Sequence, residues 1–139
     1  MKRSTLLLFI VICFSACKSN RNTAGCGMQP CTASFAYLGI RLIDNQGHAV
    51  TPKNFSAVNL RTSKTLTPMQ YPPAIDFVAG FVLITSDANI KDFSTDGDDV
   101  KITATDSLTN QIKTATLKIA GGCNCHISKI SGPETIVFD

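Results

Sequence analysis

Short runs in which apolar and polar side chains alternate fill residues 34–139 and constrain the fold more than any other feature of the chain. Successive side chains of a β-strand point to opposite faces, so a period of two predicts strands that each bury one face. The inward-facing sets that this pattern predicts are Ala36, Leu38, Ile40 and Leu42; Val58, Leu60 and Thr62; Val100, Ile102 and Ala104; and Ala115, Leu117 and Ile119.

Three further segments bring the prediction to about seven strands. Residues 81–84 are apolar at every position, which is typical of a central strand covered on both faces. Residues 127–130 and 135–138 are the last two. Seven short strands in a domain of about 100 residues are typical of an immunoglobulin-like sandwich. The sequence therefore predicts an all-β fold, a single immunoglobulin-like or transthyretin-like sandwich over residues 26–139.

The first 16 residues have the composition of a secretory signal. Lys2 and Arg3 precede an apolar run at residues 6–14, and the small residues Ser15 and Ala16 follow it. Cations, a short apolar segment and small residues before the cut are the three parts of such a signal. The run is shorter than the about 20 residues that cross a bilayer, so we expect residues 1–16 to be removed.

The residue after the expected cut is Cys17. Ser15-Ala16-Cys17 resembles the lipobox of bacterial lipoproteins, in which the cysteine thiol receives diacylglycerol. Phe14 is too large for an ordinary cleavage site, which needs a small side chain there. The resemblance implies that Cys17 becomes the lipidated first residue, held in a membrane by its acyl chains. Residues 17–25 are then this cysteine and a polar tether, whose eight residues 18–25 reach about 28 Å when extended.

Four cysteines remain after Cys13 is removed and Cys17 is lipidated, namely Cys26, Cys31, Cys123 and Cys125. In an oxidising compartment an even number of cysteines predicts disulfides. A bridge between Cys123 and Cys125 would close a small strained ring, so each is expected to pair with Cys26 or Cys31. Either pairing is open at this stage. A closed loop of about 90 residues would stabilise the fold by about 4–5 kcal/mol in the chain-entropy model.

A metal site is the alternative use of the same residues. Cys123, Cys125 and His126 lie within four positions, and thiolates with an imidazole suit zinc or copper(I). The oxidising compartment favours bridges over thiolates. We therefore expect no metal and no cofactor, and keep Cys123, Cys125 and His126 as the alternative.

No residues form a recognisable catalytic set. A cysteine nucleophile needs a free thiol beside a base, and we expect Cys125 and His126 to point apart as neighbours on a strand. His48 lies in a predicted turn and is expected to be solvated. Residues 92–99 are rich in aspartate, but Thr103 stands where a calcium loop requires Glu, so a solvated turn is expected instead of a calcium site.

Two segments carry a resemblance to a known family. Residues 40–50 contain a strand followed by Asp44-x-x-Gly47-x-x-Val50, and residues 80–87 read Gly-Phe-Val-Leu-Ile-Thr-Ser-Asp. This pattern is similar to the transthyretin-like sandwiches called carboxypeptidase regulatory-like domains. With the lipobox and polar tether, the chain resembles envelope lipoproteins of Bacteroidota that carry one such module. The resemblance implies a module that binds or spaces, with catalysis elsewhere.

The charge of the chain excludes one class of partner. The net charge is +3, but loss of residues 1–16 removes Lys2 and Arg3 and leaves 11 basic against 10 acidic residues. A domain so close to neutral has no strong basic patch for nucleic acid. The expected partners are the membrane, through the lipid, and another envelope protein or a glycan.

These observations favour a membrane-anchored envelope lipoprotein with a non-catalytic binding or structural sandwich; a periplasmic metal-binding protein is the alternative.

The residues after Cys17 predict where the lipoprotein is delivered. Enterobacterial lipoproteins retained in the inner membrane carry Asp after the lipidated cysteine, whereas this chain has Lys18. Surface-displayed lipoproteins of Bacteroidota carry acidic residues there, and residues 18–22 have none. We expect a lipid anchor in the outer membrane with the domain facing the periplasm.

The anchor gives a direct test. Replacement of Cys17 by Ser should abolish incorporation of labelled palmitate, because Ser lacks the thiol that accepts diacylglycerol. Metabolic labelling followed by immunoprecipitation measures this, and wild-type labelling of Cys17→Ser would contradict the lipoprotein prediction.

Overall fold

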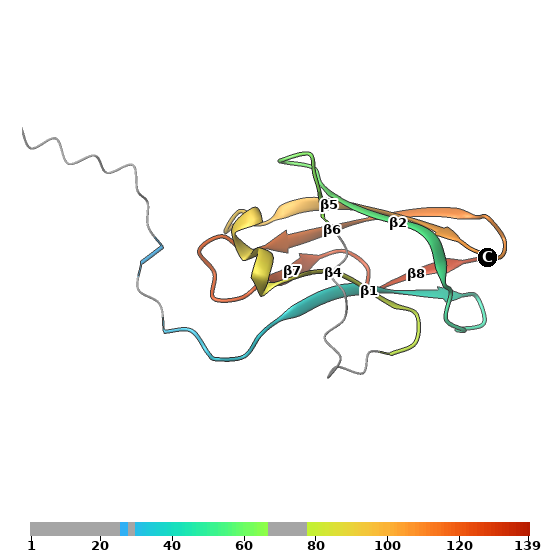
Figure 1. Cartoon of the computed structure of the whole chain (residues 1–139), viewed down its shortest axis with the longest axis horizontal. Coiled ribbons are helices and arrows are strands. Elements are labelled where there is room, and N and C mark those ends of the chain that lie inside the picture. The colour runs from blue at the N-terminus through green and yellow to red at the C-terminus, as the bar shows by residue number, and fades with distance from the viewer. Residues whose placement is uncertain (1–25, 28–29, 67–77) are drawn as a thin grey trace, which may run out of the picture.

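Two β-sheets packed face to face form the described part of the chain, residues 26–27, 30–66 and 78–139 of a computed structural model (Figure 1). The three-stranded sheet has the order β4 (Phe81–Ser86), β1 (Tyr37–Asp44), β8 (Thr135–Phe138). The five-stranded sheet has the order β3 (Lys64–Leu66), β2 (Pro52–Asn59), β5 (Asp98–Asp106), β6 (Ile112–Ala120), β7 (Ser128–Ser131). The predicted all-β sandwich is confirmed, with eight strands in these residues. Cys17 and its tether lie outside them.

The core lies between the sheets and is built from the alternating positions of β1, β5 and β6. Ile40 and Leu42 of β1 are fully buried, as predicted. The same holds for Val100, Ile102 and Ala104 on β5 and for Leu117 and Ile119 on β6. β8 pairs with β1 in parallel, whereas the other pairs of neighbouring strands are antiparallel. The period of two therefore identified the inner face of these three strands.

The predicted inward face of β2 is wrong. Ala57 is 1% exposed and Asn59 fully buried, whereas Leu60 is 51% exposed and lies beyond the end of the strand. Val58 lies on the outer face and Thr62 in the turn that follows. The apolar pattern misassigned the face because a polar residue, Asn59, occupies the inward position next to the turn.

The predicted place of β4 in the sheet is also wrong. Leu83 and Ile84 are each 1% exposed, so both faces of the strand are covered as expected. However, β4 lies at the edge of the three-stranded sheet, and β1 is its central strand. An apolar run reports burial of the two faces, and it carries no information on how many neighbours the strand has.

Two short elements were not predicted. β3 has three residues and pairs with β2 across a tight turn. A 3-10 helix, η1 (Asp87–Asp92), follows β4 directly, and the Ser86 side chain accepts a hydrogen bond from the Ala88 N–H at its start. Three residues are too few to show the period of a strand, and six are too few to show the period of a helix.

A buried carboxylate, Asp98, joins the β2–β3 turn to the start of β5. Its Oδ1 accepts hydrogen bonds from Arg61 Nε at 2.6 Å and Ser94 Oγ at 2.7 Å. Its Oδ2 accepts from Asn59 Nδ2 at 2.7 Å and from the Ser94 N–H at 3.2 Å. Asp98 is 3% exposed, so the expectation of a solvated turn is wrong at this position. The Arg61 guanidinium, aided by Ser94 and Asn59, holds the pKa of Asp98 far below its usual range despite burial.

The sandwich has two distinct ends (Figure 1). Residues 26–27 and 30–36, η1 and the β6–β7 loop lie at one, which we call the disulfide end. The β1–β2 loop, the β5–β6 turn and Asp139 lie at the opposite one, which we call the far end. Because the described chain enters at the disulfide end, the far end is the part most distant from residue 26.

Asp98 should make the fold sensitive to acid. A depressed folded-state pKa contributes stability above the pKa of the unfolded chain, and this stability is lost as pH falls below about 4. Asp98→Asn should lower the unfolding free energy at neutral pH by about 2–3 kcal/mol, because hydrogen bonds to a charge are lost, and should flatten the acid dependence. Urea unfolding between neutral pH and about pH 3 measures both.

The exposed neighbour Asp99 provides the control, since Asp99→Asn keeps the buried network. Equal acid slopes for wild type and Asp98→Asn would contradict the role of Asp98.

Candidate functional site

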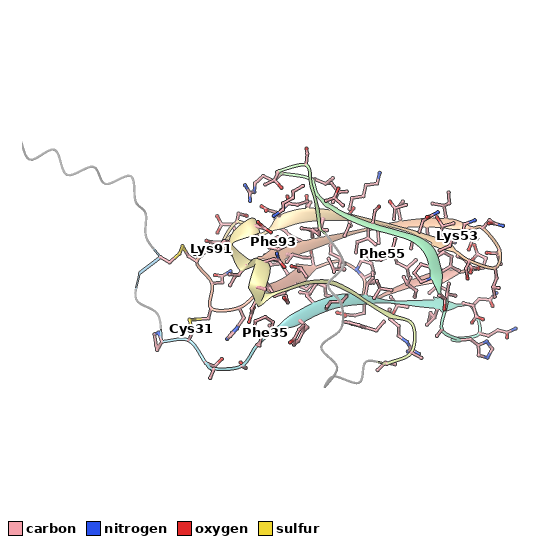
Figure 2. The ribbon with its side chains drawn as sticks, viewed as in Figure 1. Cys31, Phe35, Lys53, Phe55, Lys91 and Phe93 are labelled. Atoms are coloured by element: carbon pink, nitrogen blue, oxygen red, sulfur yellow. A yellow bond between two sulfur atoms is a disulfide. The ribbon has the colours of Figure 1, made fainter. Side chains whose placement is uncertain are left out.

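Two disulfides cross from the segment before β1 to the β6–β7 loop. Cys26 is bonded to Cys123 and Cys31 to Cys125, with Cα atoms 5.0 and 5.3 Å apart. Figure 2 shows Cys31 and the yellow sulfur bonds at the disulfide end, beside η1. The predicted cross-pairing is confirmed, and the structure supplies the connectivity that the sequence left open. Each bridge closes more than 90 residues, with separations of 97 and 94.

A glycine pair brings the cysteines of the β6–β7 loop to this position. Gly121 donates its N–H to the Ser94 carbonyl at 3.0 Å, and Gly122 donates to the Ile90 carbonyl at 2.7 Å. A Cβ at Gly121 would lie 2.5 Å from the Ile90 oxygen, and Gly122 has a φ of +61°. Only glycine fits this close, left-handed path, so Gly-Gly allows Cys123 and Cys125 to face the segment before β1.

The two disulfides occupy the cysteines that the alternative metal site at Cys123, Cys125 and His126 would need as ligands. All four sulfur atoms are in disulfides and offer no thiolate while oxidised. Within residues 26–27, 30–66 and 78–139, no three His, Cys, Asp or Glu side chains are grouped to hold a metal ion. A site at Cys123, Cys125 and His126 would require both bridges to be reduced.

Asp87, the first residue of η1, connects three segments at the disulfide end. Its Oδ2 accepts from the Ala36 N–H at 2.8 Å and from His126 Nδ1 at 2.6 Å, and its Oδ1 accepts from the Ile127 N–H at 2.8 Å. Burial opposes ionisation, but these hydrogen bonds outweigh it and hold the pKa of Asp87 below its ordinary value. Asp87 is therefore a carboxylate that fixes the imidazole of His126.

His126 continues this contact to the surface. Its Nε2 lies 2.8 Å from Thr32 Oγ1, which lies 2.7 Å from Ser34 Oγ. The side chain of Asp87 is 11% exposed and that of His126 is 27% exposed, whereas Thr32 and Ser34 are exposed. We call this series of side chains the Thr32–His126–Asp87 relay. A hydroxyl, an imidazole and a carboxylate in this order can transfer a proton from the hydroxyl.

Sequence reasoning missed the relay. Residues 125 and 126 were expected on a strand, but β7 begins at Ser128, and His126 lies in the preceding loop. The expectation that neighbours on a strand point apart therefore does not apply to it. One signal was available: Thr32 follows Cys31 and His126 follows Cys125. Pairing of Cys31 with Cys125 brings Thr32 and His126 together.

The far end is hollowed between the β1–β2 loop and the β5–β6 turn, with a volume of about 480 Å³. Asp44 there accepts from the N–H groups of Gln46 and His48 and from the His48 ring. The His48 side chain is 71% exposed, as expected for a turn. Leu108 lines the hollow and is 88% exposed. This end presents apolar and polar groups on one open surface.

Comparison with known proteins adds no assignment: no family model, curated protein or solved structure matches the chain. In the described ranges, no helix has the length and apolar character needed to cross a membrane.

The bridges predict a clear response to two reagents. A dithiol reductant should lower the unfolding free energy by several kcal/mol, with about 4–5 kcal/mol from the loss of the last remaining bridge, because only then does the unfolded chain regain the entropy of the long loop. EDTA should have no effect. Intact mass of the non-reduced protein reports the hydrogens lost in two bridges; unfolding by EDTA with stoichiometric zinc or copper would support the metal alternative.

Proposed function

We propose that this chain is a lipid-anchored envelope protein whose sandwich binds or spaces another envelope component without catalysing a reaction. The observation that carries the proposal is the pair of disulfides Cys26–Cys123 and Cys31–Cys125. Disulfides persist in oxidising compartments outside the cytosol, which is where a chain with this signal and lipobox is sent.

The position of the bridges supports tethering in particular. Cys26 is the first described residue and stands nine positions after Cys17, which we propose to be lipidated. The disulfide end is then the end close to the membrane, within about 28 Å of the lipid. The far end would be presented to the surroundings. An outer-membrane anchor with the domain facing the periplasm remains our proposal for its location.

The family resemblance belongs to the same proposal. An all-β sandwich is what a carboxypeptidase regulatory-like module requires. The Asp44-x-x-Gly47 segment is a turn in which Asp44 Oδ1 accepts two backbone hydrogen bonds and Gly47 has a φ of +86°. Both features support the resemblance, and in that family the module binds or spaces.

The far end is the surface that we propose for the partner. It combines the hollow, the 88% exposed Leu108 and the exposed amides of Asn45 and Gln46. A concave surface that offers apolar side chains together with a few polar groups is typical of binding sites. An envelope protein or a glycan would contact these residues first because they lie farthest from the anchor.

A photo-crosslinking amino acid tests the proposal in intact cells. Placed at position 108, it should give one discrete crosslinked product, because a specific partner covers the far end. The matched control is position 130 on β7, where Ile130 is 53% exposed outside the far end. Absence of a product at 108, or the same products at 108 and 130, would contradict a partner at the far end.

The same cells can be used to test on which side of the outer membrane the domain lies. Protease added outside should leave the domain intact until the outer membrane is permeabilised. Degradation in intact cells would place the domain on the surface and contradict the periplasmic orientation alone.

A further inference from the structure

We propose that Thr32 is an acyl-accepting nucleophile: its hydroxyl is activated by His126, which Asp87 positions, and it reacts with carboxylic esters to form an ester of Thr32. This goes beyond the proposed binding or spacing role, because it assigns covalent chemistry to the disulfide end. The proposal requires the transfer of one acyl group to each chain, and it requires no catalytic turnover.

The direction of the hydrogen bonds follows from chemistry. The Asp87 carboxylate only accepts hydrogen bonds, so His126 Nδ1 carries the proton of the 2.6 Å contact. In the neutral imidazole Nε2 then has a free lone pair, and the Thr32 hydroxyl at 2.8 Å donates to it. This leaves a lone pair of Thr32 Oγ1 for an electrophile. The order hydroxyl, imidazole, carboxylate is that of activated hydroxyl nucleophiles.

The relay is held in place by covalent and buried contacts. The Cys31–Cys125 bridge joins the residues that directly precede Thr32 and His126. Asp87 also accepts the N–H groups of Ala36 and Ile127, one from each of the two segments that the bridge joins. Such rigid positioning reduces the entropy lost when the reacting groups are aligned.

The reacting end of the relay is open to a substrate. Thr32 and Ser34 are exposed, whereas the carboxylate beneath them is largely buried. The backbone N–H groups of residues 32–35 have no hydrogen-bond acceptor within the described part of the chain. Free N–H groups beside a nucleophile can stabilise negative charge on a carbonyl oxygen.

A comparison with His48 shows how the surroundings of His126 differ from an ordinary histidine–aspartate contact. His48 Nδ1 also contacts an aspartate, Asp44, at 3.0 Å. Among the described residues, however, no hydroxyl is hydrogen-bonded to His48 Nε2, and its side chain is 71% exposed. Among the described residues, only His126 joins a carboxylate to a hydroxyl.

The step balances without an external oxidant or reductant. Thr32 Oγ1 attacks the carbonyl carbon of the ester, and its proton passes to His126 Nε2. The new C–O bond forms as the bond to the leaving alcohol breaks, and His126 returns the proton to the leaving oxygen. The products are acyl-Thr32 and one alcohol.

The experiment treats the purified oxidised chain with p-nitrophenyl acetate. We expect release of one equivalent of p-nitrophenolate in a first phase, and peptide fragmentation that locates one acetyl group on Thr32. Thr32→Ser keeps a hydroxyl and should remain reactive. Thr32→Val should abolish this phase because it has no nucleophile, and His126→Gln should slow it about 100-fold or more, the usual contribution of a positioned general base.

The control is Thr116→Val, which removes an exposed threonine hydroxyl on β6 and should react like wild type. Because Thr32 is exposed, Thr32→Val should fold, as its thermal unfolding will show. Wild-type rates for Thr32→Val, or acetyl groups on lysines alone, would overturn the proposal.

Discussion

The covalent link between the segment before β1 and the β6–β7 loop is the constraint on which the disulfide end depends. Residues 30–35 are exposed throughout, so they bury too little surface to hold a fixed position by packing. Cys26–Cys123 and Cys31–Cys125 supply that position instead. The N–H of Ala36 then reaches Asp87, and Thr32 reaches His126. Reduction would therefore disturb this end first and leave the core between the sheets in place.

Aspartates that accept backbone hydrogen bonds organise turns throughout the molecule. Asp44 closes the β1–β2 turn, and Asp106 closes the β5–β6 turn through the N–H groups of Leu108 and Thr109. Asp87 does the same at the disulfide end and Asp98 at the start of β5, and each also accepts from a basic side chain. The pKa values of all four are lowered, because the charged form makes these hydrogen bonds. These four carboxylates thus serve local structure.

The sequence predicted strands better than it predicted contacts between them. Alternation identified the buried faces of β1, β5 and β6, because each has one face on the core. It failed on β2, where Asn59 is buried against Asp98, and on β4, whose apolar run did not reveal its place at the edge. The cysteine count predicted the cross-bridges but not their connectivity. The relay was missed because Thr32, Asp87 and His126 come from separate segments, which the fold and the Cys31–Cys125 pairing bring together.

The two bridges also determine how the fold would carry mechanical load. A pulling force on the chain ahead of residue 26 passes through Cys26 to Cys123 and so into the end of β6. β6 lies inside the five-stranded sheet between β5 and β7, so hydrogen bonds hold it on both sides. β1, the central strand of the smaller sheet, is shielded. If the Cys26–Cys123 bridge broke, the force would pass through Cys31 to Cys125 instead. β1 would therefore be pulled from its sheet only after both bridges had broken.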